Sequence, residues 1–307
     1  MDQSKRNNVV VLLPCYNEEL TIQAVIRQMR AAVPGARIVV FDNNSKDKSA
    51  ELASAEGVEV RPVRLQGKGN VVRRMFADID ADVYLMVDAD TTYDPATATA
   101  LIAAITSGQA DMAVGVRQGK DSSFPPGHRF GNRLFNLIVA GLFGRGMQDI
   151  FSGYRAFSKR FVKSFPAHSK RFEIETELSV FTLEQRIPFV EIPSAYGERP
   201  EGSFSKLSTF KDGFRILWMI VQLYKELRPV IFFGLAAAFF AAISLLLGVP
   251  VIMDYMKTGL VQRQPTAILA SAIGILSAVL FVAGMVLEST ARAYRETRHL
   301  FYLNAPR

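Results

Sequence analysis

Two long uncharged stretches near the end of the chain constrain its fold more than any other feature. Val230 to Met253 is a run of 24 residues and Pro265 to Leu287 is a run of 23, and neither contains a charged side chain. As a helix, each run is long enough to cross a hydrocarbon core of about 30 Å. A buried helical hairpin is the alternative. The polar loop from Asp254 to Gln264 favours two membrane-spanning helices that follow a domain outside the bilayer.

Basic residues flank the two predicted spans. Lys225 and Arg228 precede the first span, whereas the loop between the spans has only Lys257 and Arg263. Four arginines follow the second span: Arg292, Arg295, Arg298 and Arg307. Because cytoplasmic flanks carry the excess of Lys and Arg, we expect a multi-pass protein of the inner (cytoplasmic) membrane. The domain before the spans and both termini are then cytoplasmic, since no apolar stretch near the amino terminus resembles a signal peptide.

Charge and cysteine content exclude several classes of function. The net charge of +7 is compatible with binding to nucleic acid. Basic residues beside membrane spans are better explained by attraction to anionic lipid headgroups. We therefore expect a lipid bilayer and no nucleic acid among the partners. The lone Cys15 allows no internal disulfide, and with three histidines the chain offers no zinc constellation. The chemistry has to come from carboxylates, basic groups and metal.

Apolar strand-like and helix-like segments alternate through the first part of the chain. Such alternation predicts an α/β domain with a mostly parallel, doubly wound sheet. The predicted strands cover residues 9–13, 37–41, 58–63, 83–87 and 112–116. The predicted helices cover the segment through Met29 and residues 48–55, 70–79, 96–106, 133–143 and 173–183.

Two carboxylates, Asp88 and Asp90, follow the apolar strand that begins at Val83. Ligands of open α/β sheets bind outside the carboxyl ends of the strands, where Tyr16, Asp42 and Asp88 should converge. Carboxylate oxygens there suit Mg²⁺ or Mn²⁺, and such a metal can neutralise the leaving group of a nucleotide-sugar. The alternative is an aspartate that only satisfies backbone N–H groups at a turn.

We divide the chain into four parts: 1–206 as the cytoplasmic catalytic domain, 207–228 as an amphipathic interface helix, 229–288 as the two-helix transmembrane hairpin, and 289–307 as a basic cytoplasmic tail. Ser208 to Leu227 has apolar residues at helical spacing, which fits a helix in the membrane interface. An amphipathic helix packed on the catalytic domain is the alternative. Gly119 to Gly131 is rich in Gly, Pro and Ser, and predicts a mobile loop over the crevice.

Five motifs occur in order at the predicted strand ends: Leu13 to Glu19, Phe41 to Asp47, Asp88-Ala89-Asp90, Val114 to Arg117 and Asp149 to Arg155. Together they resemble the family 2 glycosyltransferases of the GT-A fold. The later segment Gly202 to Lys206 and the paired spans make the chain similar to polyprenyl-phosphate glycosyltransferases such as dolichyl-phosphate mannose synthase. The resemblance covers roughly residues 9 to 228.

The resemblance implies roles for individual residues. The nucleotide-sugar would be bound by Pro14, Tyr16, Glu18, Asp42 and Asp88, and Mg²⁺ or Mn²⁺ by Asp88 and Asp90. The acceptor phosphate would be bound by Arg117, Arg129, Arg199 and Lys206, and catalysis assigned to Asp90, Arg117 and Lys206. The chain departs from the family pattern at Asn43, where a second Asp is usual, and at Thr92, where the mannose synthase branch has Gln.

Other charged residues have weaker signals. Lys68 lies between two glycines and is a candidate phosphate contact, although a lone G-K-G without P-loop spacing is nonspecific. Arg155 is expected either to brace Asp149 or to touch substrate. A lipid phosphate is largely dianionic at neutral pH, so the expected mechanism is direct inverting displacement without a strong base. Glu173 and Glu175 are the alternative base candidates.

The implied function is sugar transfer from a UDP- or GDP-sugar to a polyprenyl phosphate, with UDP and undecaprenyl phosphate favoured, for assembly or modification of cell-envelope glycans. A processive polysaccharide synthase should carry Q-x-x-R-W, but Trp218, the only tryptophan, follows Leu217. One alternative is a membrane-bound family 2 glycosyltransferase with a different acceptor. Another is a non-catalytic, membrane-anchored scaffold that binds a nucleotide. Small residues from Gly234 to Ala238 permit packing between protomers in a homo-oligomer.

Overall fold

The computed structural model describes residues 8–118, 137–141, 146–167, 174–198, 218, 221–222 and 225–306. The chain divides into two compact units. The first unit comprises Met1–Phe210 and Arg298–Arg307, and the second comprises Lys211–Thr297. The two units are described separately.

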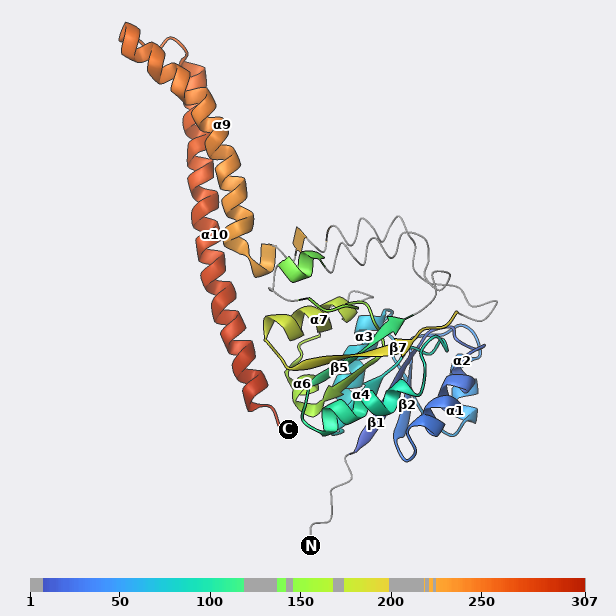
Figure 1. The fold of residues 1–307 in the computed structure, drawn as a ribbon. Coiled ribbons are helices and arrows are strands. Elements are labelled where there is room, and N and C mark those ends of the chain that lie inside the picture. Colours follow the sequence, from blue (N-terminus) through green and yellow to red (C-terminus); the bar gives the residue numbers. More distant parts are fainter. Residues whose placement is uncertain are drawn as a thin grey trace. The chain divides into compact units, whose positions relative to one another are not determined.

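A seven-stranded sheet forms the centre of the first unit, with the strand order β3-β2-β1-β4-β6-β5-β7 (Figure 1). The strands are β1 (Val9–Cys15), β2 (Arg37–Asp42), β3 (Glu59–Pro62), β4 (Val83–Met86), β5 (Met112–Gln118), β6 (Arg155–Ser158) and β7 (Phe189–Ala195). Of these seven strands, β6 alone runs antiparallel to its neighbours, β4 and β5. The predicted mostly parallel α/β sheet is confirmed.

Helices cover both faces of this sheet (Figure 1). They are α1 (Ile22–Ala32), α2 (Ser49–Ala55), α3 (Lys68–Asp78), α4 (Thr97–Thr106), α6 (Lys159–Ser164) and α7 (Ile174–Glu184). Helix α1 packs against α2 and α4, whereas α3 packs against α7. The central strands read as continuous apolar runs because they are buried on both faces: all four residues of β4 are buried.

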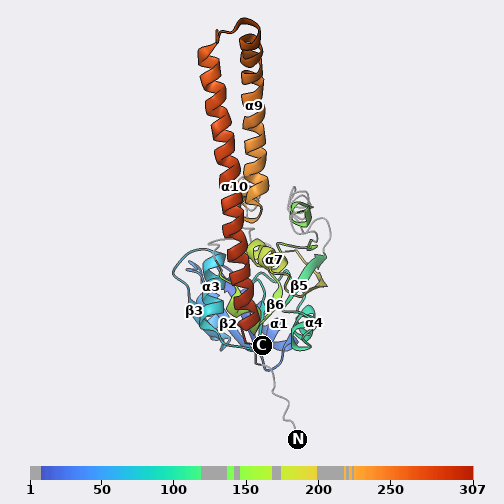
Figure 2. The same cartoon turned by 90° about the vertical axis from the view of Figure 1, so that its left-hand side faces the viewer.

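The second unit contains the long helix α9 (Pro229–Thr258) and most of α10 (Gln264–Asn304), which lie side by side in Figures 1 and 2. Both are long and apolar enough to cross a membrane. Hydrogen bonds join them, from Ser244 Oγ to the Ala270 carbonyl (2.8 Å) and from Ser277 Oγ to the Ala237 carbonyl (2.8 Å). These bonds hold the two helices as a pair.

The helices are longer than the predicted spans. Helix α9 continues to Thr258, where Gly259 ends it in a left-handed conformation with φ of 70°. The predicted loop from Asp254 to Gln264 is therefore partly helical. Helix α10 continues through the predicted basic tail as far as Asn304. Most of the predicted interface helix, Ser208 to Leu227, lies outside the described residues.

Candidate active site

Three loops at the carboxyl ends of β1, β2 and β4 contain residues with left-handed backbone. They are Asn17 (φ 53°), Asn44 (φ 60°) and Thr91 (φ 59°). Asparagine tolerates this conformation, but a β-branched threonine adopts it at a cost. Such strain persists where the surrounding structure holds it, and it is typical of ligand sites. The three loops follow the strand ends where the sequence predicts the site.

Hydrogen bonds tie the first two loops together. The Asn17 backbone N–H donates to Ser45 Oγ (2.9 Å), and the Lys46 N–H donates to Asn17 Oδ1 (2.8 Å). The Glu18 N–H donates to Ser49 Oγ (2.7 Å), and the Glu18 side chain is largely buried. Pro14 does not end β1, because the strand continues to Cys15. The segment from Pro14 to Glu18 therefore has a fixed shape.

Asp42, the last residue of β2, offers an unsatisfied acceptor. Its Oδ2 accepts from the Ser45 N–H (3.3 Å), whereas its buried Oδ1 has no hydrogen-bond partner among the residues that the structure describes. An unsatisfied buried carboxylate oxygen is costly, so a ligand hydroxyl or N–H at this position would be stabilising. This is the position at which the sequence predicts contact with a nucleotide.

Asn43 organises the loop that leads into α3. Its Nδ2 donates to the carbonyls of Val63 (2.9 Å) and Leu65 (2.8 Å), and its Oδ1 accepts from the Gly67 N–H (2.7 Å). An ionised aspartate is an acceptor only and cannot make the two donations. The departure from the family pattern at Asn43 therefore has a structural reason in this chain.

The two aspartates of the Asp88-Ala89-Asp90 motif have different surroundings. Asp90 is 3% exposed, and its Oδ1 accepts from the Thr92 hydroxyl (2.5 Å) and the Thr92 N–H (3.2 Å). The Asp88 side chain is 27% exposed. The Thr21 hydroxyl donates to the Ala89 carbonyl (2.6 Å), which connects the motif to the loop after β1.

Lys68 joins Asp88 to α7. Its Nζ lies 2.5 Å from Asp88 Oδ1 and 2.5 Å from Glu175 Oε1. Burial by itself lowers the pKa of Lys68, but the two carboxylates outweigh it and hold the pKa above its usual range. The predicted phosphate contact is thus an ion-pair partner of Asp88. Glu175, an alternative base candidate, is the other partner.

The backbone at Gly153 closes one side of Asp88. A Cβ atom built on Gly153 would lie 2.3 Å from Asp88 Oδ2, so any larger residue would displace one of them. The Gly153 N–H donates to the hydroxyl of Tyr93 (2.9 Å), which fixes this close approach. The Asp149 to Arg155 segment therefore forms part of the site's wall.

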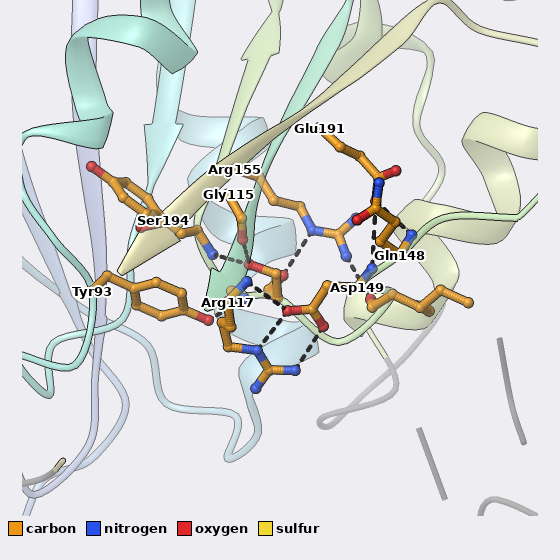
Figure 3. Close-up of polar contacts among 12 residues, drawn as sticks. Tyr93, Gly115, Arg117, Gln148, Asp149, Arg155, Glu191 and Ser194 are labelled. Carbon is orange, nitrogen blue, oxygen red and sulfur yellow. Dashed lines mark hydrogen bonds and ion pairs between the residues drawn. The ribbon is translucent and has the colours of Figure 1, made fainter. Parts of the chain in front are cut away.

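Arg117 and Asp149 form a two-bond ion pair at the end of β5 (Figure 3). Arg117 Nε and Nη2 each donate to Asp149 at 2.7 Å, and the guanidinium lies 5.5 Å from the Tyr196 ring centroid. Burial lowers the pKa of Arg117, but Asp149 together with Tyr93 and Tyr196 outweighs this effect and holds the pKa above its usual range, so Arg117 stays cationic. The predicted acceptor-phosphate residue is bound to a carboxylate in this structure.

Glu191 and Arg155 support the segment that carries Asp149 (Figure 3). A Glu191 oxygen accepts from the Gln148 N–H at 2.6 Å, and burial raises the pKa of Glu191. Arg155 is fully buried and donates to the carbonyls of Ile150 (2.6 Å) and Ser152 (2.8 Å). Burial lowers its pKa to about 10. The hydrogen bonds of Arg155 thus brace the turn, and Arg117 is the arginine that binds Asp149.

Several predicted residues lie outside the described part of the chain. They are Arg129, Arg199, Lys206, Glu173, the loop after Gly119 and the Gly202 to Lys206 motif. Within the described ranges, no group of three or more His, Cys, Asp or Glu residues could hold a metal ion. Asp88, Asp90 and the Thr92 hydroxyl remain as hard oxygen donors, which suit Mg²⁺ or Mn²⁺. Asp88 already binds one cation, the ammonium of Lys68.

Known proteins resemble the chain in sequence and in fold. Glycosyltransferase AglJ of Haloferax volcanii is 32% identical over 94% of this chain and 95% of its own length. A dolichol-phosphate mannosyltransferase of Pyrococcus furiosus is 29% identical over 74% of this chain and 67% of its own. A crystal structure of glucosyl-3-phosphoglycerate synthase from Mycobacterium tuberculosis, in complex with Mn²⁺, UDP and phosphoglyceric acid, superposes with a TM-score of 0.57. It covers 72% of this chain and 78% of its own at 21% identity, and so shows a shared fold.

Residues 10–165 match the family described as Glycosyl transferase family 2. This match spans half of the chain, and the Haloferax volcanii relative extends the similarity over nearly all of it. The sheet order, the polar loops at one edge and the similarities in sequence lead to one assignment. The chain belongs to glycosyl transferase family 2 and is a glycosyltransferase.

Proposed function

We propose that the protein transfers a sugar from a nucleotide-sugar to a polyprenyl phosphate with inversion at the anomeric carbon. The observation that carries the proposal is the buried Oδ1 of Asp42, which lacks a partner among the described residues at the edge where Asp88 and Asp90 also lie. This edge offers acceptors for a nucleoside and carboxylates for a cation. A soluble acceptor would not require the two long apolar helices.

The donor is assigned to the loops after β1, β2 and β4. Pro14, Tyr16 and Glu18 line the nucleotide pocket, and Asp42 accepts a hydrogen bond from the base or the ribose. The ordered hydrogen bonds around Asn17 support this role, because a prearranged loop loses little conformational freedom on binding. UDP is the favoured nucleotide, and GDP is the alternative that the assay below separates from it.

The metal is assigned to Asp88 and Asp90. The solved Mycobacterium tuberculosis structure contains Mn²⁺ with UDP, and the same fold here supplies two carboxylates at a strand end. When bound, Mg²⁺ or Mn²⁺ supplies positive charge that stabilises the departing diphosphate. Thr92 holds Oδ1 of Asp90, so Asp90 presents a defined orientation. Asp90 is the residue on which we expect catalysis to depend most.

The acceptor is assigned to a polyprenyl phosphate, with undecaprenyl phosphate favoured. The Pyrococcus relative is named for a dolichol-phosphate reaction, and the two apolar helices of this chain suit an enzyme that works at a bilayer. Arg117, Arg129, Arg199 and Lys206 supply positive charge for the phosphate. Asp149 already neutralises Arg117, so we assign Arg117 to positioning the acceptor. The other three residues then neutralise most of the charge of the acceptor phosphate.

The proposed chemistry requires positioning rather than a strong base. The acceptor phosphate is already largely dianionic at neutral pH, so its oxygen attacks the anomeric carbon directly as the bond to the diphosphate breaks. The positive groups stabilise the charge that develops on the leaving diphosphate. We place the catalytic domain and both termini in the cytoplasm and the helices in the inner membrane, in a protein that forms homo-oligomers.

The test is transfer from labelled UDP- and GDP-sugars to undecaprenyl phosphate in detergent with Mn²⁺. We expect one donor to give an organic-extractable, acid-labile lipid, and Asp90→Ala to lower its rate by about 10³-fold or more because the metal loses a ligand. Asp80→Asn is the control, since Asp80 is exposed beside Lys159 away from this site. If no donor labels the lipid, the proposed acceptor is wrong.

A further inference from the structure

Lys68 occupies the position of a cation at the carboxylate that we assign to the metal. Its Nζ contacts Asp88 Oδ1 and Glu175 Oε1, each at 2.5 Å. The side chains of Lys68 and Glu175 are only 12% and 6% exposed. Water therefore screens these charges weakly, and the ammonium interacts strongly with both carboxylates.

The surroundings leave Asp88 little freedom to bind two cations at once. On its Oδ2 side, the Gly153 backbone comes so close that a Cβ atom would lie 2.3 Å away. On its Oδ1 side lies the ammonium of Lys68. A divalent ion bound to Asp88 would lie close to the Lys68 Nζ. Two cations that are close together repel each other strongly where little water screens their charges.

Glu175 offers the ammonium a second partner. Lys68 is the first residue of α3 and Glu175 lies in the first turn of α7, and these two helices pack against each other. The pair is therefore held by two regular elements. Lys68 can give up Asp88 and still remain paired, which avoids the cost of an unpaired buried charge.

We propose that Lys68 is an exchangeable internal cation, which competes with the divalent metal ion for Asp88 and is retained by Glu175 when the metal binds. This inference rests on the proposed function, because it takes Asp88 as a metal ligand. Lys68 and Glu175 are then positioning residues that set the affinity of the metal site through Asp88. No covalent bond changes; one ion pair is exchanged for another.

The two residues should shift metal affinity in opposite directions. In Lys68→Met the cation that competes for Asp88 is absent, so we expect Mn²⁺ to bind about tenfold more tightly. In Glu175→Gln the ammonium has only Asp88 as a charged partner, so we expect Mn²⁺ to bind severalfold more weakly. Lys48→Met, which removes an exposed lysine before α2, should leave the affinity unchanged.

The measurement is a titration of the full chain in detergent with Mn²⁺ alone, following free Mn²⁺ by electron paramagnetic resonance. The double variant Lys68→Met/Glu175→Gln separates the proposed route from a direct effect of charge. If Glu175 acts through Lys68, the Glu175→Gln change weakens binding much less in the Lys68→Met background than in the wild type. An equal weakening in both backgrounds would show that Glu175 acts on the metal directly, and would overturn the proposal.

Unchanged or weaker Mn²⁺ binding by Lys68→Met also overturns the proposal, as does a lack of Mn²⁺ binding by both wild type and variant. The proposed function is tested separately by sugar transfer to the lipid with the wild-type chain. If transfer is observed but Lys68→Met does not bind Mn²⁺ more tightly, only the exchange is wrong. If the wild-type chain transfers no sugar, the proposed function fails whatever the titration shows.

Discussion

The two edges of the sheet differ in how their polar groups are satisfied. At the edge where β5 begins, Asp111 accepts hydrogen bonds from Ser158 Oγ (2.5 Å) and from the hydroxyl of Tyr302. At the carboxyl ends of β1 and β2, Asp42 Oδ1 has no partner among the described residues, and Asn17 has left-handed backbone. The first edge is arranged for stability, and the second retains binding capacity for a ligand.

This comparison leads to a rule for substitutions. Changes at the carboxyl edge should reduce activity more than stability, whereas changes at the opposite edge should reduce stability and leave the chemistry intact.

After Asp90→Ala, Gly153→Ala should have the largest effect on the transfer rate. The new Cβ would meet Asp88 Oδ2 at 2.3 Å and Cγ at 2.8 Å, so the carboxylate has to move away from its present position. We expect the transfer rate to fall by about 100-fold, since a displacement of about 1 Å in a catalytic group has a cost of that order. Initial rates of lipid glycosylation measure it.

Gly197→Ala is the matched control for this change. Gly197 is near the same loop, but the nearest atom to its Cβ position is the Thr92 carbonyl oxygen at 3.9 Å, which is ordinary contact. Its rate should stay within about twofold of the wild type, because surface changes of this kind have small effects. Equal losses of rate in the two variants would show that the effect of Gly153→Ala does not come from the displacement of Asp88.

Asn43→Asp should have an intermediate effect. The carboxylate cannot donate to the Val63 and Leu65 carbonyls and would repel them, so the loop before α3 should loosen. We expect a loss of about 1–3 kcal/mol in unfolding free energy. The rate should fall as well, because the loop positions Lys68. Thermal unfolding and the transfer assay measure the two losses.

Asn44→Asp provides the comparison for Asn43→Asp. Asn44 is exposed and donates to the Arg64 carbonyl at 2.6 Å, so its loss affects one solvated hydrogen bond. Its effect on stability should be below about 0.5 kcal/mol. If Asn44→Asp were the more destabilising of the two, the role given to Asn43 would be wrong.

Tyr302→Phe should have the smallest effect on activity. Tyr302 is 5% exposed, its hydroxyl binds Asp111, and Arg160 lies over its ring at 5.3 Å. Removing the hydroxyl should lower the unfolding free energy by about 1–2 kcal/mol while the transfer rate is unchanged. Tyr255→Phe, at an exposed tyrosine, should change neither. A loss of activity without a loss of stability in Tyr302→Phe would show that the two edges do not differ in this way.

The sequence predicted the parts of the fold that have strong local patterns. The apolar runs of β1, β2 and β4 were recognisable because these strands are buried on both faces. Strand β6 was not predicted, since it has four residues and begins with a buried arginine, Arg155. Strand β7 was not predicted either, because it is half-exposed and contains Glu191 and Pro193.

The positions of the candidate-site residues were predicted where these residues follow strand ends, and their contacts were missed where they depend on distant pairs. Asp42, Asp88 and Asp90 have positions that follow from chain order alone. The pairing of Lys68 with Glu175 joins residues on two different helices, and a lone G-K-G gives no sign of it. Arg117 and Asp149 were both noted, but the choice between Arg117 and Arg155 as the partner of Asp149 required the tertiary structure.

The nucleotide assignment is tested most directly by comparing Asp42→Asn with Asp80→Asn in transfer of the preferred nucleotide-sugar to undecaprenyl phosphate. Both variants replace one aspartate by its amide, at the carboxyl edge and away from it, respectively. We expect Asp42→Asn to raise KM for the donor by about 10-fold or more, because the amide oxygen stays with the Ser45 N–H and an NH2 donor replaces the acceptor Oδ1. Asp80→Asn should behave like the wild type. Equal KM values in all three proteins would contradict the assignment of the carboxyl edge to the nucleotide.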